Sequence, residues 1–154
     1  MESYESNVKR VYAPVSSVYA MLHDMNKVDR IRTMIPASMA QEHADKMKIL
    51  ETMQCTEDTV SFEAPMVGRV GIRVVERQEN SLLKFGADQS PLDFNLWIQM
   101  KETAPGESAL KVTLKVDVPF MMKMMIGSKL KDGVEKVADM LARLPYVDLG
   151  ARMV

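Results

Sequence analysis

The sequence predicts an α+β fold of helix-grip type, in which a curved antiparallel β-sheet of about seven strands wraps around one long C-terminal helix. Two patterns lead to this prediction. Several runs between residues 46 and 118 alternate apolar and polar residues, as strands with one buried and one solvated face do. Apolar residues between 119 and 144 recur every three or four positions, which marks one face of a helix. Such a helix needs an apolar surface to lie against, and the strands before it provide one.

The N-terminal part is predicted to hold one strand followed by two short helices. Residues 3–13 read as the strand, and Pro14 ends it because proline has no amide hydrogen for a ladder. Residues 15–25 follow helical spacing, and a second helix over 26–35 begins with asparagine, a good capping residue. Residues 37–45 fit either a turn of helix or an irregular loop. The alternating positions of the first strand are Tyr4, Ser6, Val8 and Tyr12.

The runs after residue 46 predict about six further strands. Their connections include a loop with two glycines at 65–71 and a segment containing a proline at 88–93. The run at 110–118 alternates most regularly, and shifting it by one residue would bury Lys111 and Lys115 without partners, which is costly. We therefore expect these strand residues to face the long helix: Leu96, Ile98, Met100, Val112, Leu114 and Val116. The helix residues expected opposite them are Ile126, Leu130, Val134 and Val137.

Length, charge and cysteine content predict a single domain in the cytoplasm. A chain of 154 residues forms one domain, here 1–154, and a net charge of −1 with interspersed signs gives no surface for nucleic acid. The opening residues are polar, and no run of about 18 apolar residues predicts a membrane span. Cys55 is the single cysteine, so no internal disulfide forms and a cytoplasmic location is expected. The composition does not indicate an oligomeric state.

No catalytic or metal-binding motif stands out. His23 and His43 lack the spacing of metal ligands, so neither a metal nor another cofactor is predicted. Gly68 and Gly71 lack the context of a phosphate-binding loop. Cys55 has no activating base nearby in the sequence and reads as a half-buried small residue.

Three polar or aromatic residues keep two interpretations each. Asp88 and Asp93 flank a proline-containing loop, where turn chemistry explains them, or they form a carboxylate pair at a cavity mouth. Trp97 shares its strand face with Asn95 and Gln99, away from the apolar face. It either packs across strands on the outer face of the sheet or anchors a partner protein there.

Methionine is unusually frequent, with 15 residues in the chain. Four of them lie within 121–125, at the start of the long helix, and others are spread over elements that can face the same interior. Methionine is unbranched and polarizable, so it fills irregular space and adapts to varied apolar molecules. The pattern therefore fits either a methionine-rich core or an adaptable cavity lining.

Lys123 breaks the apolar stripe of the long helix, because it lies seven residues before Leu130 and so near the middle of the stripe. A buried, unpaired lysine would be costly. Either the helix bends at 127–128 and lets Lys123 reach water, or Lys123 stays at the mouth of a cavity. There it would meet the carboxylate of a ligand, or a protein carboxylate such as that of Asp93.

Three segments resemble the START-like superfamily, also called SRPBCC, and in particular its small bacterial members. They are VYAPVSSVYAMLHDMN near the start, SPLDFNLWIQM, and VEKVADMLARLPY near the end. The superfamily includes the birch-pollen allergen, START lipid-transfer domains and polyketide cyclases, and the resemblance covers nearly the whole chain. It implies a cavity between sheet and helix that holds apolar ligands, whereas it does not fix an activity.

The sequence favours binding or carriage of a small hydrophobic molecule, lipid-like or aromatic and polyketide-like, without catalysis. The alternative is an enzyme of the cyclase or dehydratase type acting on a hydrophobic substrate in the same cavity, and a weaker option is a protein–protein module on the outer sheet face. The expected cavity opens beside 65–71, with Lys123 as the polar candidate at its mouth. Its expected lining is Phe62, Ile72, Phe85, Leu96, Ile98, Met100, Leu114, Val116, Met121, Met125 and Leu130. The acid–base candidates of the alternative are Tyr19, Glu51, Glu76, Arg10 and Lys123.

Overall fold

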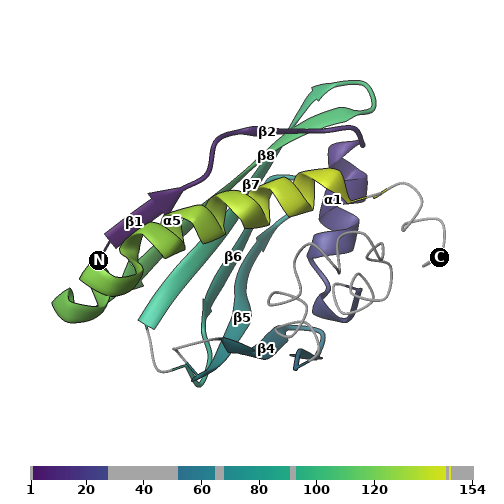
Figure 1. The fold of residues 1–154 in the computed structure, drawn as a ribbon. Coiled ribbons are helices and arrows are strands. Elements are labelled where there is room, and N and C mark those ends of the chain that lie inside the picture. Colours follow the sequence, from purple (N-terminus) through teal and green to yellow (C-terminus); the bar gives the residue numbers. More distant parts are fainter. Residues whose placement is uncertain (1, 28–51, 65–67, 91–92, 145, 147–154) are drawn as a thin grey trace.

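The computed structural model describes residues 2–27, 52–64, 68–90, 93–144 and 146 (Figure 1). Among them, eight strands form one antiparallel sheet in the order β1-β8-β7-β6-β5-β4-β3, and β2 also pairs with β8. A short helix, α1, follows β2, and a long helix, α5, follows β8. The strands are β1 (Glu2–Glu5), β2 (Lys9–Val11), β3 (Gln54–Cys55), β4 (Thr59–Ala64), β5 (Gly68–Gln78), β6 (Leu82–Ala87), β7 (Asp93–Ala104) and β8 (Glu107–Asp117). The helices are α1 (Val15–Leu22) and α5 (Phe120–Arg143). The helix-grip prediction is confirmed.

The predicted first strand is divided into β1 and β2, which both pair with β8. The break occurs at Ser6, whose amide donates to the Val112 carbonyl (2.8 Å) and whose hydroxyl accepts the Val112 amide (2.9 Å). Because a side chain takes a place in the ladder there, the alternation shifts beyond it. Val8 and Tyr12, expected on the same face as Tyr4, are exposed, and Val11 is buried instead.

The first helix is shorter than the predicted 15–25. Pro14 stands at its N-cap, and the α1 residues Val15, Val18, Met21 and Leu22 are buried. Helical backbone resumes at Met25, and the cap there is provided by Asp24, whose carboxylate accepts the Asn26 amide at 2.9 Å. The predicted cap at Asn26 is therefore two residues late. Residues 28–51, with most of the predicted second helix and the segment 37–45, lie outside the described residues.

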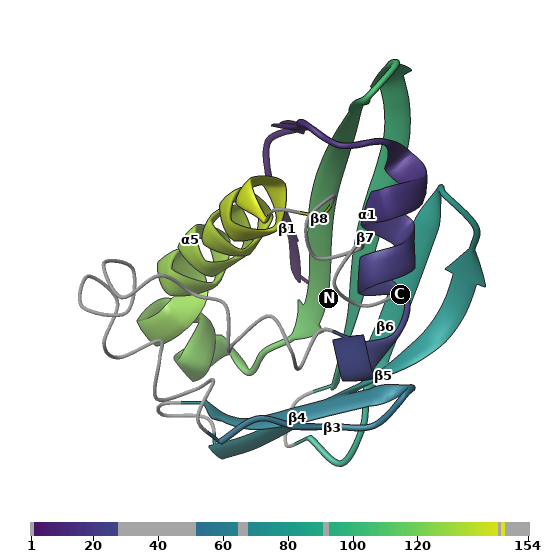
Figure 2. The ribbon, with the colours of Figure 1, turned by 90° about the vertical axis from the view of Figure 1, so that its right-hand side faces the viewer.

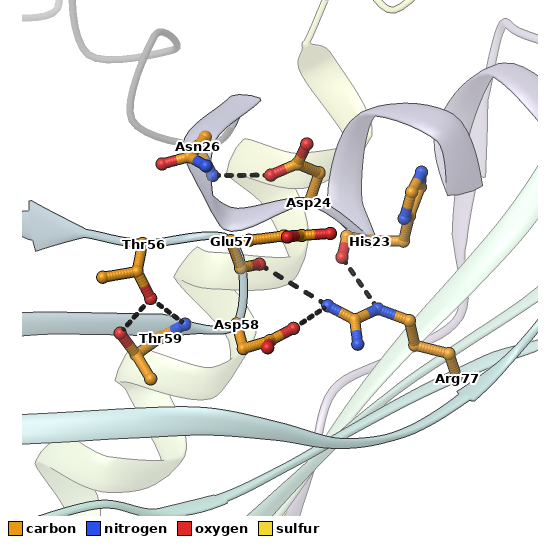
Figure 3. Close-up of polar contacts among 8 residues, drawn as sticks. All are labelled: His23, Asp24, Asn26, Thr56, Glu57, Asp58, Thr59 and Arg77. Atoms are coloured by element: carbon orange, nitrogen blue, oxygen red, sulfur yellow. Dashed lines mark hydrogen bonds and ion pairs between the residues drawn. The ribbon is translucent and has the colours of Figure 1, made fainter.

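Arg77 of β5 joins the end of α1 to the turn between β3 and β4 (Figure 3). Its guanidinium donates to the His23 carbonyl (3.0 Å), the Glu57 carbonyl (3.5 Å) and the Asp58 carboxylate (2.8 Å). The Met25 amide also donates to the Glu57 carbonyl at 3.0 Å. Two segments far apart in the sequence are thus fixed to each other by one side chain.

The helix α5 runs without interruption through Gly127 and Ser128, so no break divides it at 127–128. It packs mainly against β8, β1 and β2. Val134, Ala138 and Leu141 are buried, whereas Val137, predicted to face the sheet, is 39% exposed. Steps of four and three centre the buried stripe on Ala138 and turn Val137 to its edge. No helix in the described part of the chain is long and apolar enough to cross a membrane.

The predicted buried faces of β7 and β8 are confirmed, but the predicted contact with the long helix holds for β8, whereas β7 packs on α1. Ile98, Met100, Val112 and Val116 are buried, and Leu96 and Leu114 are half-buried. On the opposite face, Lys115 is exposed, and Lys111 forms an ion pair with Glu5 at 3.4 Å. The side chain of Ile126 is not described.

Part of the predicted loop at 65–71 belongs to β5, which begins at Gly68. Gly71 lies where the end of β6 comes very close, and its carbonyl accepts the Asp88 amide at 2.9 Å. A Cβ at this position would collide with the Asp88 carbonyl group, so only glycine fits. Residues 65–67 lie outside the described residues.

We expect Gly71→Ala to destabilise the protein by about 1–3 kcal/mol, because the added methyl group would push β5 and the end of β6 apart. The matched control is Gly133→Ala in α5, where a Cβ meets no atom within 4 Å. That change should stabilise the protein by about 0.5–1 kcal/mol, since alanine favours a helix over glycine. Urea unfolding measures both, and equal effects of the two variants would contradict the close approach at Gly71.

Three charged residues tie β2 to the C-terminal half of α5. The Lys9 ammonium contacts the carboxylates of Glu135 and Asp139, the latter at 2.9 Å. The Asn7 amide donates to the other Glu135 oxygen at 2.9 Å. The Lys9 ammonium and the Asn7 amide lower the pKa of Glu135, and the Glu135 and Asp139 carboxylates raise the pKa of Lys9.

These shifts predict how stability depends on pH. A glutamate with a lowered pKa stabilises the fold above its ordinary value of 4.5, and this contribution is lost as the pH falls through the folded-state pKa. The stability difference between the wild type and Glu135→Gln should therefore be present at about pH 7 and shrink below the ordinary value. Thermal unfolding over a pH series measures it.

The pKa of Lys9 is raised in the folded state, so the stability that Lys9 contributes is lost at alkaline pH, as the pH rises above 10.5 through the folded-state pKa. Lys9→Met tests whether the two residues act as a pair. If they do, the double variant Lys9→Met/Glu135→Gln should lose less stability than the sum of the losses in the two single variants. A stability difference that stays constant down to low pH, or strictly additive losses, would show that the pair does not act as described.

Candidate functional site

The inner face of the sheet is incompletely packed at its centre. Leu96 of β7 pairs with Leu114 of β8, and both are half-buried. The next pair along the same face, Ile98 and Val112, is buried, and so is the pair on the other side, Phe94 and Val116. Interiors are normally close-packed, so two inward-facing leucines that remain partly accessible mark a place where packing is incomplete, which we call the hollow.

The same partial burial continues across the sheet and onto the helix. Phe62 of β4 and Ile72 of β5 point to the face that carries Leu96, and both are half-buried, as is Leu130 of α5. Val60, Val74 and Phe85 lie between them and are buried. Figure 2 shows the sheet curving from β8 round to β4, so that its inner face turns toward α5. The main contacts of α5 are with β8, β1 and β2, and not with the inner face of β4 to β6.

The predicted lining residues thus fall into three groups. The half-buried group around the hollow consists of Phe62, Ile72, Leu96, Leu114 and Leu130. The buried group behind it consists of Phe85, Ile98, Met100 and Val116. Met121 and Met125 form the third group and are 74% and 63% exposed. Met125 precedes Val134 by nine residues, about half a turn away from the buried stripe, so its side chain points outward.

One end of the hollow carries polar groups. The Lys123 ammonium forms an ion pair with the Glu2 carboxylate at 2.8 Å. The Lys123 ammonium lowers the pKa of Glu2, and the Glu2 carboxylate raises the pKa of Lys123. The partner of Lys123 is therefore a protein carboxylate, but it is Glu2 and not Asp93, which pairs with Asp117 on the outer face. The sequence could not show this partner, because the two residues lie far apart along the chain.

The other acid–base candidates within the described residues lie on three separate elements. Tyr19 stacks on His23 with ring centroids 5.0 Å apart, and burial lowers the pKa of this histidine. Glu76 is exposed and accepts a hydrogen bond from Gln78 at 2.7 Å, and Arg10 is exposed on β2. Glu51 and His43 lie outside the described residues. Among the residues that are described, no three potential ligands are grouped to hold a metal ion.

The outer face holds Trp97, as predicted. Two lysine ammonium groups lie over its ring, that of Lys84 at 5.4 Å and that of Lys115 at 5.7 Å from the ring centroid. This is the cross-strand packing expected for an outer-face tryptophan. Asp88 follows β6 and forms an ion pair with Arg73 of β5 at 3.8 Å.

Sequence reasoning missed a groove of about 550 Å³ between β2 and the last turns of α5. Its lining is Lys9, Arg10, Tyr12, Asp139, Ala142, Arg143 and Leu144. Four of these seven side chains are charged, in contrast to the apolar face around Leu96. The sequence signals for this groove were the adjacent charges Lys9 and Arg10 in β2 and the charge of Arg143 at the end of α5.

No family model and no curated protein sequence matches the chain. Solved structures do resemble it. Norcoclaurine synthase from Thalictrum flavum, in complex with dopamine and hydroxybenzaldehyde, aligns with a TM-score of 0.68 at 9% identity, over 92% of this chain and 84% of that chain. A solution NMR structure from Thermobifida fusca aligns with a TM-score of 0.62 at 15% identity, over 97% of this chain and 95% of that one.

The Aha1 dimer from Colwellia psychrerythraea aligns with a TM-score of 0.55 at 10% identity, over 93% of this chain and 98% of that chain. At identities this low, the likeness establishes the fold and leaves the activity open. The three resemblances agree with the eight-stranded sheet and the long C-terminal helix described above. The chain therefore has the helix-grip fold, and these structures are consistent with the resemblance of its sequence motifs to START-like, or SRPBCC, proteins.

Proposed function

We infer that the protein binds or carries a small hydrophobic molecule, lipid-like or aromatic, between the inner face of the sheet and α5. The observation that carries this proposal is the pair Leu96 and Leu114, two inward-facing leucines that stay half-buried between buried neighbours. An apolar molecule placed against them removes their remaining surface from water. The fold supports the proposal, since proteins with this fold bind hydrophobic ligands, as the aromatic molecules bound to norcoclaurine synthase illustrate.

The chemistry of the lining favours binding over reaction. The predicted lining residues that are half-buried all have hydrocarbon side chains, and the polar groups Lys123 and Tyr4 lie only at one end, whereas general acid–base catalysis needs a titratable group beside the reacting atoms. Apolar contact contributes about 25 cal/mol per Å², so burying roughly 300 Å² of a ligand gives about 7–8 kcal/mol before the cost of lost motion. We therefore expect affinities that are micromolar or weaker.

Binding of the uncharged fluorescent probe N-phenyl-1-naphthylamine tests the proposal. The wild type should bind it with a micromolar Kd, and Leu96→Phe, which fills the hollow, should weaken binding roughly tenfold. The matched control is Val75→Phe, which adds bulk at an exposed position and should leave the Kd unchanged. Circular dichroism verifies that each variant is folded.

Native mass spectrometry of the protein purified from cells gives an independent readout, because a retained apolar molecule appears as added mass. If the wild type neither binds the probe nor retains such a molecule, the space around Leu96 is not a binding site. Equal weakening by Leu96→Phe and Val75→Phe would place the probe somewhere other than the hollow.

A further inference from the structure

We propose that Lys123 and Tyr4 together bind the carboxylate of an amphipathic ligand whose apolar part lies against Leu96 and Leu114. The inference deepens the proposed function, on which it rests, and names the class of ligand as a carboxylic acid with a hydrophobic body. Two donors from different elements lie near each other at one end of the hollow, on either side of Gly127. One is an ammonium group on α5 and the other is a phenol hydroxyl on β1.

Tyr4 places its hydroxyl between the sheet and the helix. It pairs with Leu114 in the antiparallel ladder of β1 and β8, and directly paired residues point to the same face. The residue is half-buried and packs against the core. Its hydroxyl makes no hydrogen bond within the part of the chain that the structure describes. A half-buried donor without a partner, next to an apolar hollow, is available to a polar group of a ligand.

Lys123 reaches the same place from the helix. The Tyr4 hydroxyl lies 3.7 Å, and the Lys123 Cγ 3.9 Å, from the point where a Gly127 side chain would begin. Both atoms are thus within ordinary van der Waals distance of the same point on the helix. Beyond Cγ, the lysine has further rotatable bonds, so its ammonium group can turn from the rim toward the phenol. A carboxylate with two oxygens suits this pair, because one oxygen can accept from each donor.

In the unbound protein, the Glu2 carboxylate occupies the position beside the Lys123 ammonium that we assign to the ligand carboxylate. Glu2 pairs with Val116 in the ladder and so lies on the inner face, at the edge of the hollow. Both partners are substantially exposed, with side-chain exposures of 45% and 42%. An exposed pair of this kind contributes little to stability, so a ligand carboxylate can displace Glu2 into water at low cost. Glu2 is thus a competitor of the ligand and Lys123 is the group for which both compete.

Dodecanoate and its uncharged methyl ester, each displacing N-phenyl-1-naphthylamine, test the inference. The wild type should prefer the acid by roughly three- to tenfold, the range expected for a charge-assisted hydrogen bond at a partly exposed site. Lys123→Met should abolish this preference while leaving the affinity for the ester unchanged. Tyr4→Phe should reduce the preference in part, because one donor remains.

Glu2→Gln separates ligand binding from a structural role. If Glu2 competes with the ligand, this variant should increase the preference for the acid, in the direction opposite to Lys123→Met. If the ion pair only ties β1 to α5, both variants should lower the melting temperature alike and neither should change the acid-to-ester ratio. That second result would overturn the inference.

The same titrations distinguish this failure from a failure of the proposed function. A wild type that binds acid and ester equally well retains a hydrophobic site and loses only the carboxylate contact. A wild type that binds neither compound, nor the probe, has no hydrophobic site at all. Raising the salt concentration should reduce the preference for the acid and not the binding of the ester, because an exposed ionic contact is screened.

Discussion

The width of the sheet relative to one helix governs this structure. Seven strands in sequence across the sheet span roughly 30 Å, at about 4.8 Å per neighbouring pair, whereas a helix with its side chains is about 10 Å wide. One helix can therefore cover only a few strands, and α5 packs mainly on β8, β1 and β2. The apolar residues of β7 to β4 extend beyond this cover, and the half-buried leucines at 96 and 114 lie where it ends.

Charged contacts near both ends of α5 accompany this off-centre position. Lys123 meets Glu2 of β1 near the N-terminal end, and Glu135 and Asp139 meet Lys9 of β2 toward the other end. Buried contacts at Val134, Ala138 and Leu141 supply the apolar attraction between them. Close packing of these buried residues against the sheet fixes the position of the helix, whereas exposed ion pairs such as that of Lys123 with Glu2 contribute little to its stability.

The sequence predicted what depends on short-range periodicity, and not what depends on distant partners. Alternation at 110–118 identified the buried face of β8, and helical spacing placed α5 within a residue at each end. The break at Ser6 was missed because a side-chain hydrogen bond to Val112 interrupts the strand. The Lys123 partner was missed for the same kind of reason, since Glu2 lies on another element. The outward direction of Met125 could have been found by extending the helical phase back from Val134.

Incomplete packing at the centre of the sheet has a consequence for stability as well as for binding. The fully buried residues beside Leu96 and Leu114, among them Leu83, Leu110 and Val112, provide close-packed apolar contact in the core. In the proposed function, a molecule bound against the two half-buried leucines would bind only the folded state and would raise the apparent stability with its concentration. Stability measured with and without an added ligand is therefore a second readout of the proposed binding.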